Sequence, residues 1–227
     1  VMTPWVVKPL YGLVSDNIPI FGYKRKPYIL LMNPLMCFLW FSILYIETIK
    51  SLTYTMFFLQ VSLVFTDVMY DSLLVENSRF EETGKHGELQ SRCWMSKGIG
   101  ATLASILSGF LVKSVSFEYI ILILIVFCSI LIYVCANYII EKRDSIKKDK
   151  ISIVGGIIKM YHSFKRIFKV MTQPDMFRPA LFIFVLGSTP SSSTPFFYFL
   201  VTKLNFDSRA LGLISSVSNA SVAFGSF

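Results

Sequence analysis

Apolar stretches long enough to cross a bilayer recur along this 227-residue sequence, and they restrict its fold more than any other feature. A helix needs about 20 predominantly apolar residues to cross a membrane. Only 16% of the residues are charged, against about 25% in an ordinary soluble domain. We therefore expect a multi-pass integral membrane protein of a plasma or organelle membrane. The expected spans are residues 1–14, 28–46, 52–75, 93–112, 117–140, 179–204 and 208–227.

The first and last of these spans are incomplete, so we expect the chain to be part of a longer protein. Basic residues gather in alternate connections: the first, third and fifth hold most of the 22 Lys and Arg residues. The positive-inside rule places these connections in the cytoplasm. The net charge of +8 follows this alternation and does not form the aromatic-interleaved stripe of a nucleic-acid-binding surface. We therefore expect a lipid bilayer around the chain and no nucleic-acid partner.

Four ionisable residues, Lys8, Asp67, Asp71 and Lys97, interrupt the apolar spans. An ionisable group within a membrane is costly unless it faces protein or water. Asp67 and Asp71 are four residues apart and so share one helix face. The four residues predict a polar site inside a helical bundle, where two acids and two bases compensate each other. Neighbouring carboxylates also oppose each other's ionisation, which makes Asp67 and Asp71 candidates for carrying a proton.

Hydroxyl residues lie between two prolines in the span 179–204, which Pro190 and Pro195 interrupt. Irregular backbone at membrane depth is tolerated only where it is buried in protein or lines a wet cavity. We therefore expect a binding segment whose two prolines act in gating. A kinked helix whose hydroxyls bond to its own carbonyl oxygens is the alternative. The candidate binding residues of this segment are Ser191, Ser192 and Thr194.

The longest connection, residues 141–178, divides the chain. Within it, residues 154–168 place apolar side chains near helical spacing, with basic side chains elsewhere. This pattern suits a helix that lies along the membrane surface. A solvated basic linker is an equally open alternative. We expect three parts: residues 1–140, a basic cytoplasmic linker over 141–178, and residues 179–227.

The sequence offers no pattern typical of an enzyme or a metal centre. It contains no Ser/His/Asp set and no HExxH motif. Its two histidines are isolated, and its four cysteines have no metal-ligand spacing, so we interpret the cysteines as packing residues. We therefore expect no enzymatic activity, no catalytic residue, no metal and no cofactor.

Four longer motifs follow one another along the chain: WVVKPLYGLVSD with GYKRKPY after it, DVMYDSLLVENSR, LQSRCWMSKGIGA, and FRPALFIFVLGSTPSSSTPFFYF. Together they resemble the folate-biopterin transporter family of the major facilitator superfamily. The resemblance implies an incomplete all-α membrane bundle of about seven of twelve helices. Helices two to six of the N-terminal half would occupy residues 1–140, and helices seven and eight of the C-terminal half would occupy residues 179–227. It also implies proton-coupled secondary transport of folate, biopterin or a related pterin.

One loop departs from the superfamily's Gly-x-x-x-Asp-Arg pattern. Gly12 and Asp16 match it, but Asn17 stands where the pattern has Arg, and the basic residues around Arg25 come later. The resemblance implies a gating role for Gly12, Asp16 and Arg25, with the partner of Asp16 left open. A capped helix end, with the neighbouring lysines on anionic lipid, is the alternative.

The four buried charges suit a folate, which is a flat, hydrogen-bonding ring system with a glutamate tail. Lys8 and Lys97 would supply cations for the two tail carboxylates, and Asp67 and Asp71 would accept hydrogen bonds from the ring. Arg92 is a further binding candidate. Side chains available to stack on the ring are Trp5, Tyr11, Tyr70 and Trp94.

Two other functions remain open. The first is transport of a different organic anion. The second is a receptor or scaffold of the same fold that does not transport, in which permanent Asp–Lys pairs only hold two helices together.

Overall fold

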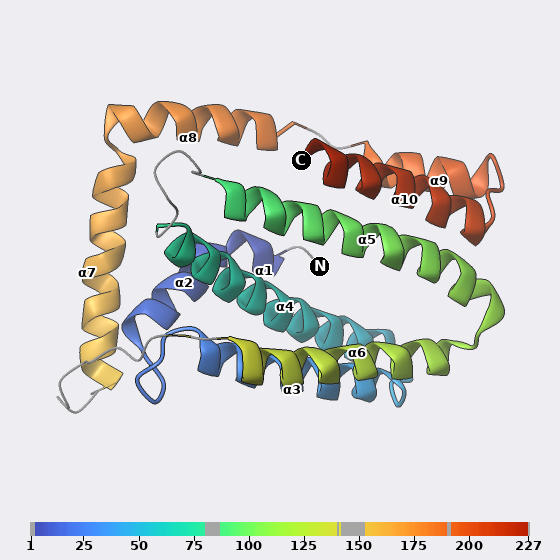
Figure 1. Cartoon of the computed structure of the whole chain (residues 1–227), viewed down its shortest axis with the longest axis horizontal. Coiled ribbons are helices and arrows are strands. Elements are labelled where there is room, and N and C mark those ends of the chain that lie inside the picture. The colour runs from blue at the N-terminus through green and yellow to red at the C-terminus, as the bar shows by residue number, and fades with distance from the viewer. Residues whose placement is uncertain (1–2, 80–86, 140, 142–152, 190–191, 227) are drawn as a thin grey trace. The chain divides into compact units, whose positions relative to one another are not determined.

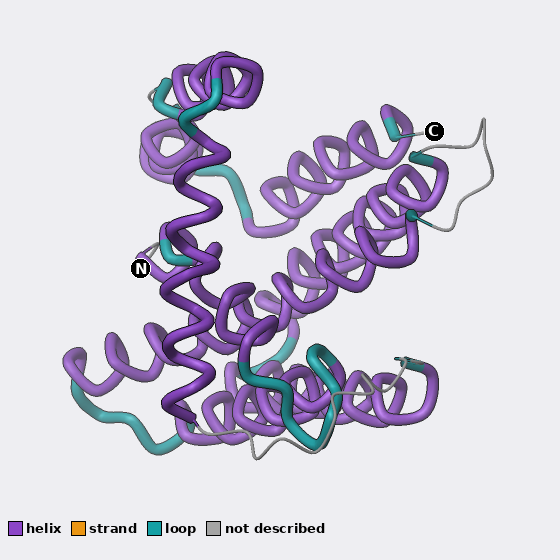
Figure 2. Tube along the Cα trace, turned by 90° about the vertical axis from the view of Figure 1, so that its left-hand side faces the viewer, coloured by secondary structure: helices purple, strands orange, loops and turns teal. Residues whose placement is uncertain are grey.

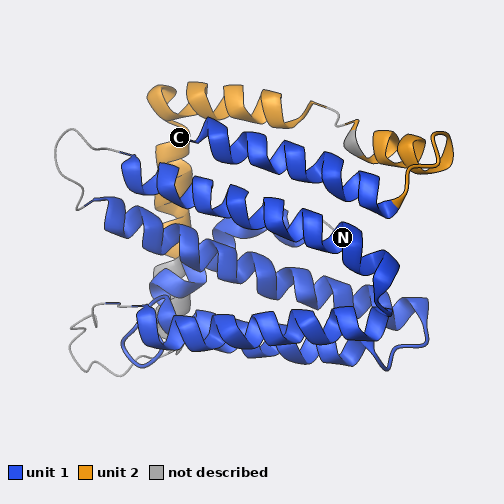
Figure 3. Ribbon diagram, turned by 45° about the vertical axis from the view of Figure 1, so that its right-hand side comes forward, with its two compact units in different colours: residues 1–149, 208–227 blue, residues 150–207 orange. Residues whose placement is uncertain are grey.

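The computed structural model describes residues 3–79, 87–139, 141, 153–189 and 192–226. Over these residues the chain forms ten helices and no strand (Figure 2). This confirms the predicted all-α fold. The chain divides into two compact units, Val1–Asp149 with Ser208–Phe227, and Lys150–Asp207 (Figure 3).

The first unit contains the four helices that are long and apolar enough to cross a membrane, namely α3 to α6. They confirm four of the predicted spans. The predicted span 1–14 is divided between two short helices, because Pro9 has no N–H with which to continue the first helix into the second. The helices of this unit are α1 (Thr3–Val6), α2 (Lys8–Asn17), α3 (Lys26–Ile43), α4 (Ile49–Ser78), α5 (Glu88–Ser114), α6 (Phe117–Tyr138) and α10 (Ser208–Gly225) (Figure 1).

Helix α3 packs against both α4 and α6. Near its start, Tyr28 and Ile29 are buried with Phe65 and Met69 of α4 and with Cys135 of α6. This packing fixes the rotation of α4, the helix that carries the two predicted aspartates. A second cluster, nearer the end of α3, consists of Leu39, Ile43, Leu59 and Ile121.

Helices α5 and α10 approach each other closely through glycine residues. A Cβ atom on Gly212 would lie 2.8 Å from the carbonyl oxygen of Ser105 and 2.9 Å from Cα of Gly109. A side chain at that position would collide with backbone, so only glycine permits this approach. Asn219 adds a hydrogen bond from its Nδ2 to Ser105 Oγ, at 2.9 Å.

The second unit contains α7 (Ile153–Met171), α8 (Pro174–Gly187) and α9 (Ser193–Thr202). Helix α7 confirms that residues 154–168 are helical. Helix α8 begins inside the expected linker rather than at Pro179, because Pro174 in its first turn and the acidic Asp175 both favour a helix start.

The predicted interruption of the span 179–204 is confirmed, since α8 ends at Gly187 and α9 begins at Ser193. The alternative reading of this segment also has support. The hydroxyl of Ser188 donates to the carbonyl oxygen of Phe184 at 2.7 Å, one turn earlier on α8.

Candidate functional site

The four ionisable residues that interrupt the predicted spans meet in the first unit, and we call them the charge cluster: Lys8 of α2, Asp67 and Asp71 of α4, and Lys97 of α5. Lys8 Nζ lies 2.7 Å from Asp67 Oδ2 and 3.3 Å from Asp71 Oδ2. Lys97 Nζ lies 3.5 Å from Asp67 Oδ1 and 3.6 Å from Asp71 Oδ1. Each cation thus contacts both carboxylates. The cluster brings the predicted charges together and balances them.

The members of the charge cluster differ in contact and exposure. Lys8 and Asp67 form the shortest pair, and their side chains are 32% and 25% exposed. Lys97 and Asp71 lie farther apart, and their side chains are 52% and 47% exposed. Ion pairs are weaker where water reaches them. Lys97 and Asp71 are therefore the members best placed to exchange a partner with an incoming polar molecule.

Each lysine of the cluster lies over a tryptophan three residues earlier in the chain. Lys8 Nζ is 5.2 Å from the ring centroid of Trp5, and Lys97 Nζ is 5.3 Å from that of Trp94. At these distances the negative face of the ring attracts the ammonium group. Both predicted tryptophans thus border the charge cluster.

The two predicted tyrosines are engaged elsewhere. The ring of Tyr11 packs against Phe65, with 5.2 Å between the centroids. The hydroxyl of Tyr70 lies 2.8 Å from the sulfur of Cys135. Both tyrosines therefore pack in the core around α3 and α4, so the stacking role suggested by sequence falls to the tryptophans.

Gln60 of α4 is a polar neighbour of the cluster that the sequence-based prediction missed. Its Oε1 accepts a hydrogen bond from Trp5 Nε1 at 3.3 Å. It precedes Asp67 by seven residues, which is about two helical turns, so the two share one face of α4. That spacing was the available signal. Through Trp5, Gln60 helps to place the ring over which Lys8 lies.

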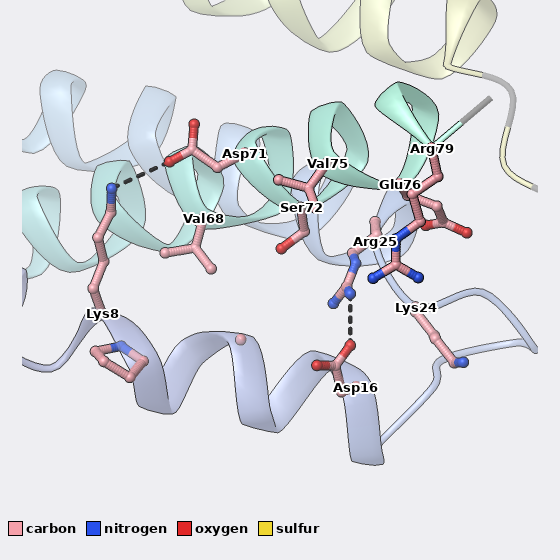
Figure 4. Close-up of a pocket in the computed structure, with 12 residues that line it drawn as sticks. Lys8, Asp16, Lys24, Arg25, Val68, Asp71, Ser72, Val75, Glu76 and Arg79 are labelled. Carbon is pink, nitrogen blue, oxygen red and sulfur yellow. Dashed lines mark hydrogen bonds and ion pairs between the residues drawn. The ribbon is translucent and has the colours of Figure 1, made fainter. Parts of the chain in front are cut away.

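A pocket of about 660 Å³ opens beside the cluster (Figure 4). Lys8 and Asp71 lie at one end of it, and Asp16, Arg25 and Arg79 lie at the other. The predicted Gly12 is in the wall between them. Sequence reasoning gave no binding role to four further polar residues of the lining. They are Lys24, Ser72, Glu76 and Arg79.

Three of these residues, Ser72 and Glu76 of α4 and Arg79 just after it, had a usable signal in the sequence. Val68, Asp71, Ser72, Val75, Glu76 and Arg79 all line the pocket, and their spacing of three and four residues is that of one helix face. The helix face that carries Asp71 therefore predicts further pocket residues toward the end of the helix.

Arg25 supplies the arginine that the sequence lacks at position 17. Its Nη2 lies 2.5 Å from Asp16 Oδ1, and its Nη1 donates to the hydroxyl of Ser15. A tight turn returns the chain to this position, with φ of 53° at Phe21 and 83° at Gly22. The partner of Asp16 that the pattern left open is therefore Arg25.

Glu141 joins this loop to the end of α6. Its carboxylate accepts backbone N–H bonds from Lys24 at 2.8 Å, Arg25 at 3.0 Å and Lys26 at 2.8 Å. A carboxylate is favourable at a helix N-terminus, where N–H groups lack partners within the helix. Lys26 Nζ in turn donates to the carbonyl oxygen of Ile139 at 2.9 Å. The first turn of α3 and the end of α6 are thus held together beside the pocket.

The other predicted residues are not part of the charge cluster. Arg92 pairs with Glu88, one turn earlier on α5, at 2.5 Å, and its side chain is 71% exposed. The rest come after the end of α8 at Gly187, and Thr194 and Pro195 lie in the first turn of α9. Ser192, Thr194 and Pro195 are in the second unit, whereas Pro190 and Ser191 lie outside the described residues. The roles assigned to these residues stay predictions.

Among the described residues, no group of three or more His, Cys, Asp and Glu side chains is arranged to hold a metal ion. The cysteines in this part of the chain are free thiols. Cys128 and Cys135 are buried, and Cys37 and Cys93 are half-buried.

Comparison with curated proteins gives three informative relatives. The chain is 29% identical to a folate-biopterin transporter of Synechocystis sp. over 225 residues, which are 98% of this chain and 44% of that protein. It is 30% identical to Folate transporter 1 of Plasmodium falciparum over 220 residues, covering 92% of this chain and 40% of the relative. It is 34% identical to Probable folate-biopterin transporter 4 of Arabidopsis thaliana over 137 residues, covering 59% of this chain and 28% of the relative.

The chain therefore spans less than half the length of these relatives. No solved structure matches it. Its apolar helices and its relatives identify it as an integral membrane protein. The family match extends over residues 1–226, and the chain belongs to the BT1 family.

Proposed function

We propose that this chain is part of a secondary active transporter that moves folate, biopterin or a related pterin, coupled to protons. The observation that supports it most is the charge cluster, which opens into a pocket of about 660 Å³ in a member of the BT1 family. Residues 1–140 and 179–227 would then belong to two halves of a major facilitator-like fold, joined by the linker 141–178.

The chemistry of a pterin ring fits the charge cluster. The ring carries an amino group and a ring N–H that donate hydrogen bonds, and a carbonyl oxygen that accepts them. Asp71 and Asp67 would accept from the donors, and Lys97 would donate to the oxygen. Trp5 and Trp94 would offer ring faces on which the flat substrate stacks. The larger exposure of Lys97 and Asp71 supports a role in first contact with the substrate.

The proposal of proton coupling rests on the balance of charge in the cluster. Two carboxylates and two ammonium groups compensate each other in the charge cluster. A proton on Asp71 would remove one of the two partners of Lys97 and leave Asp67 as the other, so the cation would be more available to the substrate. Uptake should therefore rise when the compartment that supplies substrate is made more acidic. Uptake that is insensitive to an imposed proton gradient would contradict the coupling.

Gating is assigned to the ion pair of Asp16 and Arg25, which lies at the far end of the pocket from the cluster. Gly12 is in the pocket wall, where a Cβ atom would lie 3.7 Å from Val68 Cγ1. Ser192, just before α9, and Thr194 and Pro195, in the first turn of α9, are proposed to contribute binding and gating groups from the C-terminal half.

The function is tested with the complete coding sequence that contains this chain, expressed in a host deficient in folate and pterin transport. Uptake of labelled folate or biopterin should appear with the wild-type protein. Lys97→Gln should lower it about tenfold or more, a loss of about 1.4 kcal/mol. Lys50→Gln removes a charge from an exposed position at the start of α4 and should leave uptake unchanged.

Three outcomes would contradict the proposal. Binding of labelled folate without its movement into vesicles would identify a receptor or scaffold. Uptake of neither folate nor biopterin, with uptake of another organic anion, would identify a different substrate. Equal uptake by wild type and Lys97→Gln would remove the charge cluster from the substrate site.

A further inference from the structure

The end of the pocket at Lys8 and Asp71 is electrically balanced by the charge cluster. Lys8 and Lys97 are each within 3.6 Å of both Asp67 and Asp71. A site with its cations already paired suits a polar, uncharged ring. It is a poor site for two additional carboxylates, because binding them there would first require the existing ion pairs to separate.

The outer end of the same pocket has an excess of positive charge. Its lining includes Lys24, Arg25 and Arg79, with Asp16 and Glu76 as the acidic members. Asp16 is bound to Arg25. Figure 4 shows the guanidinium groups of Arg25 and Arg79 directed into this end of the pocket. A carboxylate that enters here therefore meets a net positive surface.

The distance between the two ends suits a substrate in which a pterin ring is joined to a glutamate tail. Asp71 of α4 and Arg79, the residue that caps the end of α4, both line the pocket and are eight residues apart, which is about 12 Å along the helix axis at about 1.5 Å per residue. In a folate, an aminobenzoyl group separates the pterin ring from the glutamate. A ring bound at Asp71 would place the glutamate near the end of α4.

We infer that Arg79, at the outer end of the pocket, binds the dicarboxylate tail of a folate and so selects tailed folates over unconjugated pterins. The inference rests on the proposed function and adds a subsite to it. Arginine suits this role because its planar guanidinium group can donate two parallel hydrogen bonds to one carboxylate. Arg79 is exposed at the end of α4, so a tail can reach it. This moves the tail from the two cluster lysines, where sequence alone suggested it, to the outer end of the pocket.

The test compares folate with biopterin, which has the ring and a short hydroxylated side chain but no glutamate. The complete protein is expressed as wild type, Arg79→Gln, Arg79→Lys and Lys50→Gln. Arg79→Gln should raise the KM for folate about tenfold and leave that for biopterin within about twofold. Arg79→Lys should restore part of the folate affinity, because it restores the charge. Lys50→Gln should resemble wild type with both substrates.

A competitor adds an independent measurement. p-Aminobenzoylglutamate, which is the tail without the ring, should inhibit folate uptake by wild type and inhibit Arg79→Gln more weakly. The biopterin uptake of Arg79→Gln shows in the same experiment that the variant folds.

The results that would contradict the tail subsite differ from those that would contradict the proposed function. If wild type carries both substrates and Arg79→Gln changes both KM values equally, or neither, the tail subsite is wrong and the proposed function stands. If wild type carries neither substrate, the proposed function fails and the subsite fails with it.

Discussion

At the scale of single residues, the charge cluster is asymmetric. Asp67 is the least exposed of the four side chains and makes the shortest ion pair, with Lys8 at 2.7 Å. Asp71 is nearly half exposed and also lines the pocket. The two carboxylates, one turn apart on α4, therefore differ in what they do. We therefore expect Asp67 mainly to hold α2, α4 and α5 together, and Asp71 to contact the substrate of the proposed site.

This difference predicts separate effects for two conservative substitutions. Asp67→Asn should lower the free energy of unfolding by roughly 1–2 kcal/mol, less than the ~3–5 kcal/mol of a fully buried pair, because water reaches these side chains. Asp71→Asn should lower it by less than about 1 kcal/mol. Thermal unfolding of the two purified variants measures both values. Equal destabilisation, or a larger effect of Asp71→Asn, would contradict this assignment.

Sequence alone predicted the cluster because a charge inside an apolar span is rare and costly. It did not predict Gln60 or Arg79, for opposite reasons. Gln60 is uncharged and gives no strong signal inside a span. Arg79 follows the last residue of α4, where charged residues are common, so its spacing from Asp71 did not single it out.

At the scale of elements, the contact between α5 and α10 depends on glycine. Gly109 and Gly212 allow the two backbones to approach, and a Cβ atom on Gly212 would be 2.8 Å from the Ser105 carbonyl oxygen. Helix α5 also carries Lys97 of the charge cluster. A change in this contact therefore displaces one wall of the proposed site.

The contact predicts opposite effects for two identical substitutions. Gly212→Ala should destabilise the protein by about 1–3 kcal/mol, because backbone must move to accept the new atom. Gly100→Ala meets nothing within 4 Å and should be neutral or stabilise by up to about 1 kcal/mol through helix propensity. Thermal unfolding in detergent measures both. Equal melting temperatures for the two variants would contradict the close approach.

The start of α3 depends on Glu141 in a similar way. The Glu141→Ala substitution removes the acceptor of three backbone N–H groups, at Lys24, Arg25 and Lys26. Loss of about 1–2 kcal/mol of local stability should speed amide hydrogen exchange there about 5–30-fold. Exchange followed by mass spectrometry on the peptide that contains these residues measures it.

The matched control for that experiment is Glu47→Ala, which removes an exposed carboxylate just before α4. It should leave exchange at the start of α3 unchanged. Unchanged exchange in Glu141→Ala as well would show that the contact with Glu141 does not stabilise the helix.

The helices themselves were largely predictable, and their ends were not. The spans of α3 to α6 follow from long apolar runs, which have few other structures open to them in lipid. The start of α8 at Pro174 was not predicted, because the expected span began at the next proline, Pro179. That residue lies inside the helix. The hydrogen bonds of Glu141 join residues more than 100 positions apart, so no local sequence pattern predicts them.

At the scale of the whole molecule, the basic connections predict which side of the membrane each loop faces. The turn that carries Phe21 and the end of α4 should be cytoplasmic, and the connection between α3 and α4 should face the opposite side. The ion pair of Asp16 and Arg25, proposed to act in gating, and the proposed tail subsite at Arg79 would then lie at the cytoplasmic end of the pocket.

Labelling of introduced cysteines tests this orientation. Phe21→Cys, at a side chain that is 85% exposed, should react with an impermeant thiol reagent only from the cytoplasmic side. Glu47→Cys should react only from the other side. The half-buried Cys37 and Cys93 are replaced by serine to lower the background. Labelling of both positions from the same side would contradict the predicted topology.

The most direct test of the central claim is the initial rate of folate uptake in a double-variant cycle of Asp67→Asn and Lys97→Gln. Each single variant leaves one charge with fewer partners, whereas the double variant is again neutral. If the cluster binds substrate, the double variant should be no faster than the slower single variant. Recovery of uptake toward the wild-type rate in the double variant would show that the charges only hold α4 to α5, and would contradict the claim.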